Sequence, residues 1–192
     1  MIAESASRTR QIFASRRHIP SKSAVITVAR IPATPSLRSR WQAAETRSRF
    51  VREAVAAHAV YVPEVRHPVE VGADQSAHLV QWLSKRLGAP LKAPRLEKQG
   101  FELVGGRLLP GNDGARAQFM YQDQSGNRVS LYVTGDKDGA ETGFRRYAED
   151  GALALYWVDK GYCYAVTGAV GEDKLSAIAN SAYRQLLDRS AT

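Results

Sequence analysis

The feature that most constrains the fold is a series of short apolar segments between residues 101 and 168, separated by very short connections. The segments "ARAQFMYQD" and "RVSLYVTGD" flank the turn "QSGN", and "LALYWVD" and "YCYAVTG" flank the dipeptide Lys160-Gly161. Their β-branched and aromatic residues and their alternating apolar positions are typical of strands. Because such short connections cannot hold a crossover between parallel strands, they predict antiparallel hairpins.

Two further segments have strand character. We expect "FELVGGRLLP" (101–110) to form two short strands broken at Gly105-Gly106, where a glycine pair favours a bend or bulge. We expect "HPVEV" (67–71) to form a strand in which Pro68 marks a sheet edge or a strand start. Together these segments predict an antiparallel sheet of about five to six strands.

Three segments have helical patterns. A long amphipathic helix is predicted over 37–60, where the sequence is free of Gly and Pro. A second helix, "QSAHLVQWLSKRLG", is predicted to be capped by Asp74 and stopped at Gly88. A closing helix starts at Glu172-Asp173. The predicted class is α+β, with helices packed on one face of the antiparallel sheet and preceded by the long helix.

The net charge of +8 is concentrated at the beginning of the chain. Residues 1–52 contain 11 of the 27 Lys and Arg residues and two of the 19 acidic residues, so the remainder is nearly neutral. Residues 1–36 are rich in Arg and Ser and lack helical or strand periodicity, and we expect them to be a disordered basic arm. This composition is also typical of an organellar transit peptide, or of a misplaced start site or reading frame.

The sequence therefore predicts three parts: a disordered arm (1–36), an amphipathic helix (37–60) and an α+β domain (61–192). We expect no membrane-spanning helix and no clear signal peptide. The most apolar early run, Ser23 to Ala33, includes Arg30 and Pro32 and is shorter than the roughly 20 apolar residues that cross a bilayer. Cys163 is the only cysteine, which excludes an intrachain disulfide and a cysteine-based zinc site.

Histidines suggest one possible chemical site. His58, His67 and His78 fall on three different predicted elements, and their spacing is not the i, i+4 spacing that places two ligands on one helical face. A fold could still gather them with Glu64 or Glu70 into a metal or small-molecule site. We favour structural roles for them, because no combination of an acid, a histidine and a nucleophile is evident nearby, and we predict no catalytic residue, no bound metal and no cofactor.

The arginines of the first predicted helix suggest a second possible site. Residues 8–52 could bind nucleic acid or an anionic lipid surface, since arginines pair well with phosphate. Solvated helix arginines are more common than phosphate ligands, so this function remains an alternative. The candidate anion-binding residues on the helix are Arg38, Arg40, Arg47, Arg49 and Arg52.

Several blocks of the chain carry a resemblance to a known family. The strings "VYVPEVRHPVEV", "HLVQWLSKRLG", "GFELVGGRLLP" and "AQFMYQDQSGNRVSLYV", followed by "YAVTG", resemble the outer domain of bacterial transmembrane anti-sigma factors. The blocks occur in the same order over about residues 41–190.

The resemblance implies a non-enzymatic regulatory domain on the periplasmic face of the inner membrane. In that family a cytoplasmic segment sequesters an extracytoplasmic-function sigma factor, and a membrane helix connects it to the outer domain. The resemblance also implies a possible envelope protein as a partner, and we expect no sequence-specific nucleic-acid binding. The sigma-binding segment and the membrane helix have no recognisable counterpart in residues 1–36, so we do not expect this chain by itself to inhibit a sigma factor.

Limited proteolysis provides a test of the predicted boundary. If the core begins near Trp41, digestion of the full chain should leave a stable fragment that starts between about residues 37 and 60. N-terminal sequencing and intact mass of the fragment would locate the first cut. Initial cleavage within the β region would contradict this prediction.

Overall fold

The two predicted hairpins form the middle of an antiparallel sheet in the computed structural model. The structure describes residues 36–112, 114–136, 140–149 and 152–187. In the first hairpin, Asp123 closes the turn by accepting hydrogen bonds from the backbone N–H groups of Ser125 and Asn127. The hairpin strands are β3 (Gly114–Gln122), β4 (Arg128–Gly135), β6 (Ala152–Asp159) and β7 (Tyr162–Gly168).

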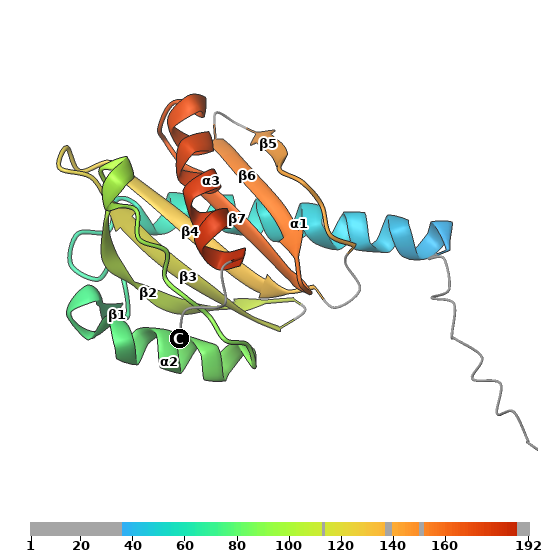
Figure 1. Ribbon diagram of the computed structural model, residues 1–192, viewed down its shortest axis with the longest axis horizontal. Coiled ribbons are helices and arrows are strands. Elements are labelled where there is room, and N and C mark those ends of the chain that lie inside the picture. The colour runs from blue at the N-terminus through green and yellow to red at the C-terminus, as the bar shows by residue number, and fades with distance from the viewer. Residues whose placement is uncertain (1–35, 113, 137–139, 150–151, 188–192) are drawn as a thin grey trace, which may run out of the picture. The chain divides into compact units, whose positions relative to one another are not determined.

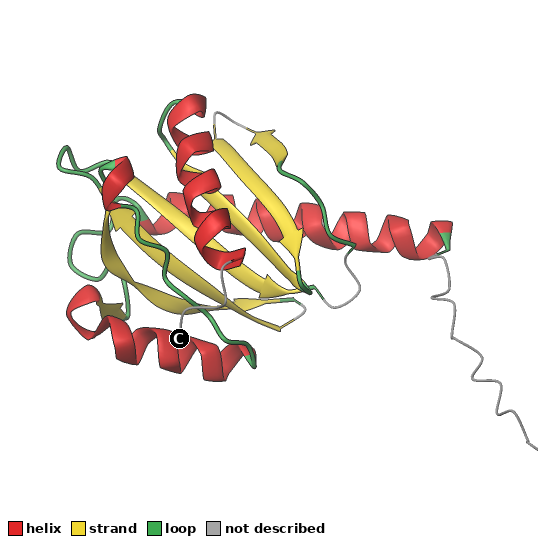
Figure 2. Ribbon diagram, viewed as in Figure 1, coloured by secondary structure: helices red, strands yellow, loops and turns green. Residues whose placement is uncertain are grey.

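Three more strands complete a seven-stranded sheet (Figure 2). The spatial order is β1-β2-β3-β4-β7-β6-β5, and all neighbouring strands are antiparallel. The additional strands are β1 (Val71–Gly72), β2 (Glu102–Gly111) and β5 (Arg145–Glu149). The predicted α+β class is confirmed, and the sheet has slightly more strands than the five to six predicted.

Two of the three helices pack on one face of the sheet. They are α2 (Ser76–Leu87), which follows the 3₁₀ turn η1 (Ala73–Gln75), and α3 (Glu172–Leu187). Leu79 and Leu83 of α2 and Leu175 and Ile178 of α3 are fully buried in the main hydrophobic core. A second 3₁₀ turn, η2 (Glu97–Gln99), leads into β2.

The long helix α1 (Leu37–Tyr61) lies against the opposite face of the sheet (Figure 1). Along β4, Leu131 and Val133 belong to the main core, whereas Tyr132 packs in a second cluster with α1. Because successive strand residues point to opposite faces, the two clusters lie on opposite sides of the sheet. The second cluster joins Phe50, Val51 and Ala54 of α1 to residues of β4, β6 and β7.

Four local predictions differ from the structure. Asp74 makes no capping hydrogen bond to α2; it lies within η1, and Gln75 occupies the N-cap position. The predicted strand 67–71 is reduced to Val71–Gly72 because the chain around Pro68 wraps the sheet edge. The segment 101–110 is not two strands but the single strand β2, in which the predicted glycine irregularity is a bulge between Leu103 and Gly105. β5 was not predicted from the sequence.

No helix in the described part of the chain is long and apolar enough to cross a membrane. The predicted disordered arm, residues 1–36, lies outside the described residues except for Ser36.

A glycine at the interface between α2 and the sheet provides a test of the packing. A Cβ atom on Gly106 would lie 2.6 Å from the backbone oxygen of Gln118 and 3.1 Å from a methyl group of Leu79. We expect Gly106→Ala to lower the free energy of unfolding by about 1–3 kcal/mol through overpacking. Chemical denaturation would measure the change in the free energy of unfolding. Gly143→Ala is the matched control, because nothing lies within 4 Å of its added methyl group, and equal stability losses in both variants would contradict the prediction.

Candidate functional site

The interface between α1 and the sheet contains several polar contacts between distant parts of the chain. Only part of the helix takes part in it. Phe50, Val51 and Ala54 are buried, whereas Leu37 and Trp41 near the start of α1 are 74% and 76% exposed. The first turns of α1 therefore extend beyond the apolar contacts that hold its second half.

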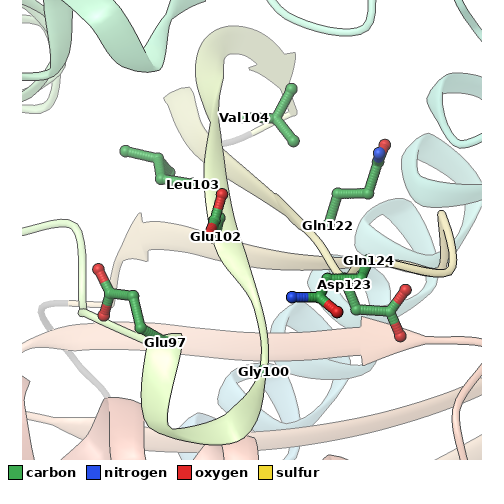
Figure 3. A pocket seen from close by; sticks show the side chains of 8 residues that line it. All are labelled: Glu97, Gly100, Glu102, Leu103, Val104, Gln122, Asp123 and Gln124. Atoms are coloured by element: carbon green, nitrogen blue, oxygen red, sulfur yellow. The ribbon is translucent and has the colours of Figure 1, made fainter.

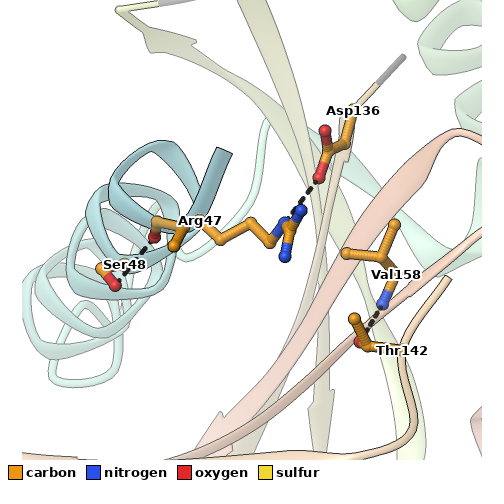
Figure 4. A network of polar contacts seen from close by, with 6 residues as sticks. Arg47, Ser48, Asp136, Thr142 and Val158 are labelled. Atoms are coloured by element: carbon orange, nitrogen blue, oxygen red, sulfur yellow. Dashed lines mark hydrogen bonds and ion pairs between the residues drawn. The ribbon is translucent and has the colours of Figure 1, made fainter. Parts of the chain in front are cut away.

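Two ion pairs fasten α1 to the strands. Arg47 Nε lies 3.1 Å from a carboxylate oxygen of Asp136, just after β4, and the two side chains are only 13% and 11% exposed (Figure 4). Arg116 of β3 contacts Glu53 of α1 at 2.6 Å, and the Arg116 side chain is 5% exposed. The Glu53 side chain is 31% exposed, and the other three are buried more deeply. Removal of one partner would leave the other charge unpaired in a partly or fully buried position, so both pairs favour one position of the helix.

A buried polar group lies beneath the second half of α1. His58 Nδ1 is 2.9 Å from the hydroxyl oxygen of Ser130 on β4, and Gln118 Nε2 donates a hydrogen bond of 3.2 Å to the same oxygen. Burial lowers the pKa of His58 to about 4, so the ring is neutral at pH 7. The Ser130 hydroxyl can then donate to His58 while it accepts from Gln118.

Two arginines hold the segment that leaves α1. Arg128 Nη1 lies 2.7 Å from the carbonyl oxygens of both Val62 and Glu64. Arg107, which is 6% exposed, donates to the carbonyl oxygen of His67 at 2.8 Å, and its guanidinium stacks 3.5 Å from the centre of the Tyr61 ring. We call residues 62–70 the strap, since they pass from α1 around the sheet edge to β1.

A groove of about 280 Å³ opens between the second half of α1 and the β2–β3 hairpin. Its walls are mostly apolar, and the Glu53–Arg116 ion pair forms their polar part. The lining residues are Glu53, Ala54, Ala56, Ala57, Val60, Tyr61, Leu109, Pro110, Arg116 and Tyr132.

A second hollow, also of about 280 Å³, lies near the start of β2 and the turn after β3 (Figure 3). Glu97, Glu102 and Asp123 give it an acidic lining. The Asp123 carboxylate accepts hydrogen bonds within its own turn. These hydrogen bonds, chiefly the one from the Asn127 side chain, lower its pKa. Among the described residues, these three carboxylates are not arranged as a group that could hold a metal ion.

The structure does not bring the three candidate histidines together. His58 is buried against Ser130, and His67 and His78 are exposed on the strap and on α2. Since α1 and α2 cover opposite faces of the sheet, His58 and His78 lie on opposite sides of it. Glu64 accepts hydrogen bonds from the backbone N–H groups of His67 and Arg66, which lower its pKa. Within the described residues, no group of three or more His, Cys, Asp or Glu side chains is arranged to hold a metal ion.

The candidate arginines of α1 have different environments. Arg38, Arg40 and Arg52 are exposed, and the Arg49 side chain is 40% exposed and 4.0 Å from Glu45. Arg47 is committed to Asp136. The five arginines therefore do not form a single exposed basic surface.

Sequence reasoning missed the polar residues beneath α1. Arg116, Gln118 and Gln122 alternate along β3 with Ala117, Phe119 and Tyr121, a pattern that normally indicates a solvent-exposed face. The long helix covers that face, so Arg116 and Gln118 are buried. A helix at 37–60 with its own apolar stripe was the only available signal that this face would be covered.

Part of the chain is similar to solved structures. No family model matches the chain, and no curated protein shows a significant match. The complex structure of Pseudomonas aeruginosa MucA/MucB is similar to part of the chain, with a TM-score of 0.34 and 22% identity over 42% of this chain and 30% of that chain. A crystal structure of MucB in complex with MucA(peri) has a TM-score of 0.35 and 22% identity over 43% of this chain and 32% of that chain. The chain thus spans about a third of the solved chains it matches, and similarity at this level carries no functional argument.

The neutral His58 ring leads to a pH prediction. Its pKa is about 4 in the folded protein, against 6.5 for the free side chain, so below pH 6.5 the unfolded chain binds more protons. Stability should therefore be lost as the pH falls from about 6.5 to about 4, by up to about 3 kcal/mol. Urea denaturation at a series of pH values would measure the loss.

His58→Asn keeps a polar atom near Ser130 and removes the titration, so this variant should lack that component of the pH dependence. The exposed His78→Asn should keep the wild-type dependence. A His58→Asn profile parallel to wild type across this range would contradict the assignment.

Proposed function

We propose that this chain is a non-enzymatic regulatory domain of the kind found outside the membrane in transmembrane anti-sigma factors. The observation that carries the proposal is that α1 is one continuous helix of 25 residues whose second half is fastened to the sheet and whose first turns extend beyond it. At 1.5 Å per residue the helix is roughly 37 Å long. It can therefore act as the joint between the preceding chain and the domain.

The contacts of α1 favour mechanical coupling between the helix and the sheet, so that a shift of either one would move the other. The helix is held near its middle by the Arg47–Asp136 and Arg116–Glu53 ion pairs, and Arg128 holds the chain where the helix ends. A change in strands β4, β6 or β7 would shift these contacts and so the position of the helix. Packed interfaces of this type switch between discrete arrangements more readily than they deform continuously.

The sequence resemblance supports the class of partner and the location. It favours an extracytoplasmic-function sigma factor, bound through a segment that would precede α1, and a position on the periplasmic side of the inner membrane. The groove beside α1 offers a concave, largely apolar surface on which an envelope protein could act. Contact there would bear directly on the helix, because six of the lining residues belong to α1.

The environments of the two most reactive side chain types support a non-enzymatic role. His58 is buried beneath α1, and desolvation lowers its pKa to about 4. Cys163 is also buried, and desolvation raises the pKa of its thiol to about 12, so it is not a thiolate at pH 7. Neither side chain is exposed to a substrate, and the Cys163 thiol lacks the deprotonated state that nucleophilic catalysis requires.

A fusion experiment tests the proposed joint. Residues 37–190 would be joined behind the sigma-binding segment and membrane helix of a transmembrane anti-sigma factor, with a reporter driven by the matching sigma factor. We expect the fusion to restore a response to envelope stress that is absent when residues 61–190 are removed. Arg47→Gln with Glu53→Gln should weaken the response, because this variant breaks both ion pairs of α1.

The matched control is Glu45→Gln with Arg49→Gln, which removes an exposed pair on the same helix and should leave the response unchanged. The reporter output of each fusion would be compared at equal protein levels. A response that is identical with and without residues 61–190 would refute the proposal.

A further inference from the structure

The first turns of α1 carry an apolar stripe that the rest of the domain does not cover. Leu37 and Trp41 lie one helical turn apart, so they share one side of the helix, and their side chains are 74% and 76% exposed. Ala44 follows on the same side and is also exposed. Figure 1 shows this part of the helix extending beyond the sheet. Keeping a tryptophan and a leucine in water is unfavourable, so binding to an apolar phase at this stripe would be favourable.

Two arginines flank the apolar stripe. At about 3.6 residues per turn, Arg38 and Arg40 fall roughly 80° to either side of the line through Leu37 and Trp41. Both arginine side chains are exposed, and within the described residues neither makes an ion pair. Glu45 is the only acidic residue between positions 37 and 52. The start of the helix therefore combines an apolar centre with exposed positive charge on both sides.

We propose that the apolar stripe and its two flanking arginines bind the surface of a lipid bilayer that contains anionic headgroups. Tryptophan favours the boundary between hydrocarbon and headgroups, where its ring is buried and its indole N–H still finds a hydrogen-bond acceptor. Arginines beside it can lay their apolar stems along the same boundary while their guanidinium groups reach the phosphates. Helices that lie in a membrane interface have this combination of side chains.

The composition of the stripe favours lipid over nucleic acid. A duplex presents phosphates to arginine, but its backbone offers no apolar phase for Leu37 and Trp41. The inference narrows the anion-binding alternative to the two arginines that adjoin the stripe, since Arg47 and Arg49 each have an acidic neighbour. It does not rest on the regulatory role proposed above, because binding to vesicles requires no sigma factor.

Fluorescence quenching by lipid tests the contact on the full chain. The chain has three tryptophans, of which Trp157 is buried in the main core and Trp82 is half-buried on α2. Equimolar vesicles of phosphatidylglycerol and brominated phosphatidylcholine should quench the wild-type emission. Trp41→Phe keeps an apolar ring and should still bind, but the lipid-dependent quenching should be lost. Vesicles of brominated phosphatidylcholine alone should quench the wild type less, because they carry no net charge.

Co-sedimentation with equimolar vesicles of phosphatidylglycerol and phosphatidylcholine would measure the affinity of each variant. Leu37→Ser with Trp41→Ser removes the apolar contact and should weaken binding about tenfold. Arg38→Gln with Arg40→Gln removes the charge contact and should also weaken binding about tenfold. All four side chains are exposed, so both variants should unfold in urea at the wild-type midpoint.

Two matched controls should bind like the wild type. Val65→Ser removes an apolar side chain that is 84% exposed, but on the strap. Lys85→Gln with Arg86→Gln removes two exposed cations from α2 and so makes the same change in net charge as the α1 arginine variant. This second control accounts for the general attraction between a basic chain and an anionic surface.

Three results would overturn the inference. They are a wild type that brominated lipid does not quench, a Trp41→Phe variant that is quenched as strongly as the wild type, and equal weakening by the α1 arginine variant and its charge-matched control. If the wild type is not quenched but binds random duplex DNA, and the α1 arginine variant loses that binding, the two arginines belong to a nucleic-acid surface instead.

Discussion

The arrangement of the other elements depends on the hydrogen bonds that Arg128 makes where α1 ends. A helix end leaves carbonyl groups without intrahelical partners, and a cation near that end is favourable. From β4, Arg128 Nη1 lies 3.5 Å from the carbonyl oxygen of Tyr61, the last helical residue, and donates to the carbonyl oxygens of Val62 and Glu64 just beyond it. Arg107 then holds the strap at His67. With both contacts made, the chain turns around the sheet edge and starts α2 on the opposite face.

The helix held in this way covers a polar strand face instead of an apolar one. Arg116, Gln118 and Ser130 are buried beneath it and are matched by Glu53 and His58 of the helix. Such contacts add less net stability than apolar packing, but they are directional and disfavour other positions of α1. A helix held by directional contacts at a fixed position suits a joint that must transmit small displacements.

The local parts of the fold could be predicted because their causes are local. The turns "QSGN" and Lys160-Gly161 are too short for anything but hairpins, and the period of apolar residues identified α1 and α3. The predictions failed where pairing with a neighbouring strand determined the local structure. β2 continues through Gly105 and Gly106 because β3 pairs with it on both sides of the bulge. β5, a short charged segment, is a strand because β6 provides its partners.

The sequence by itself determined the class of the fold, the antiparallel hairpins and the positions of the helices, since period and turn length act over a few residues. It also placed the single cysteine and the three candidate histidines, His58, His67 and His78, far apart along the chain. Only the tertiary structure decided which face α1 covers, and with it that His58 and Arg116 are buried and that His67 and His78 are not. The reason is physical: alternation along a strand distinguishes two faces, but burial of a face depends on long-range contacts that local pattern does not specify.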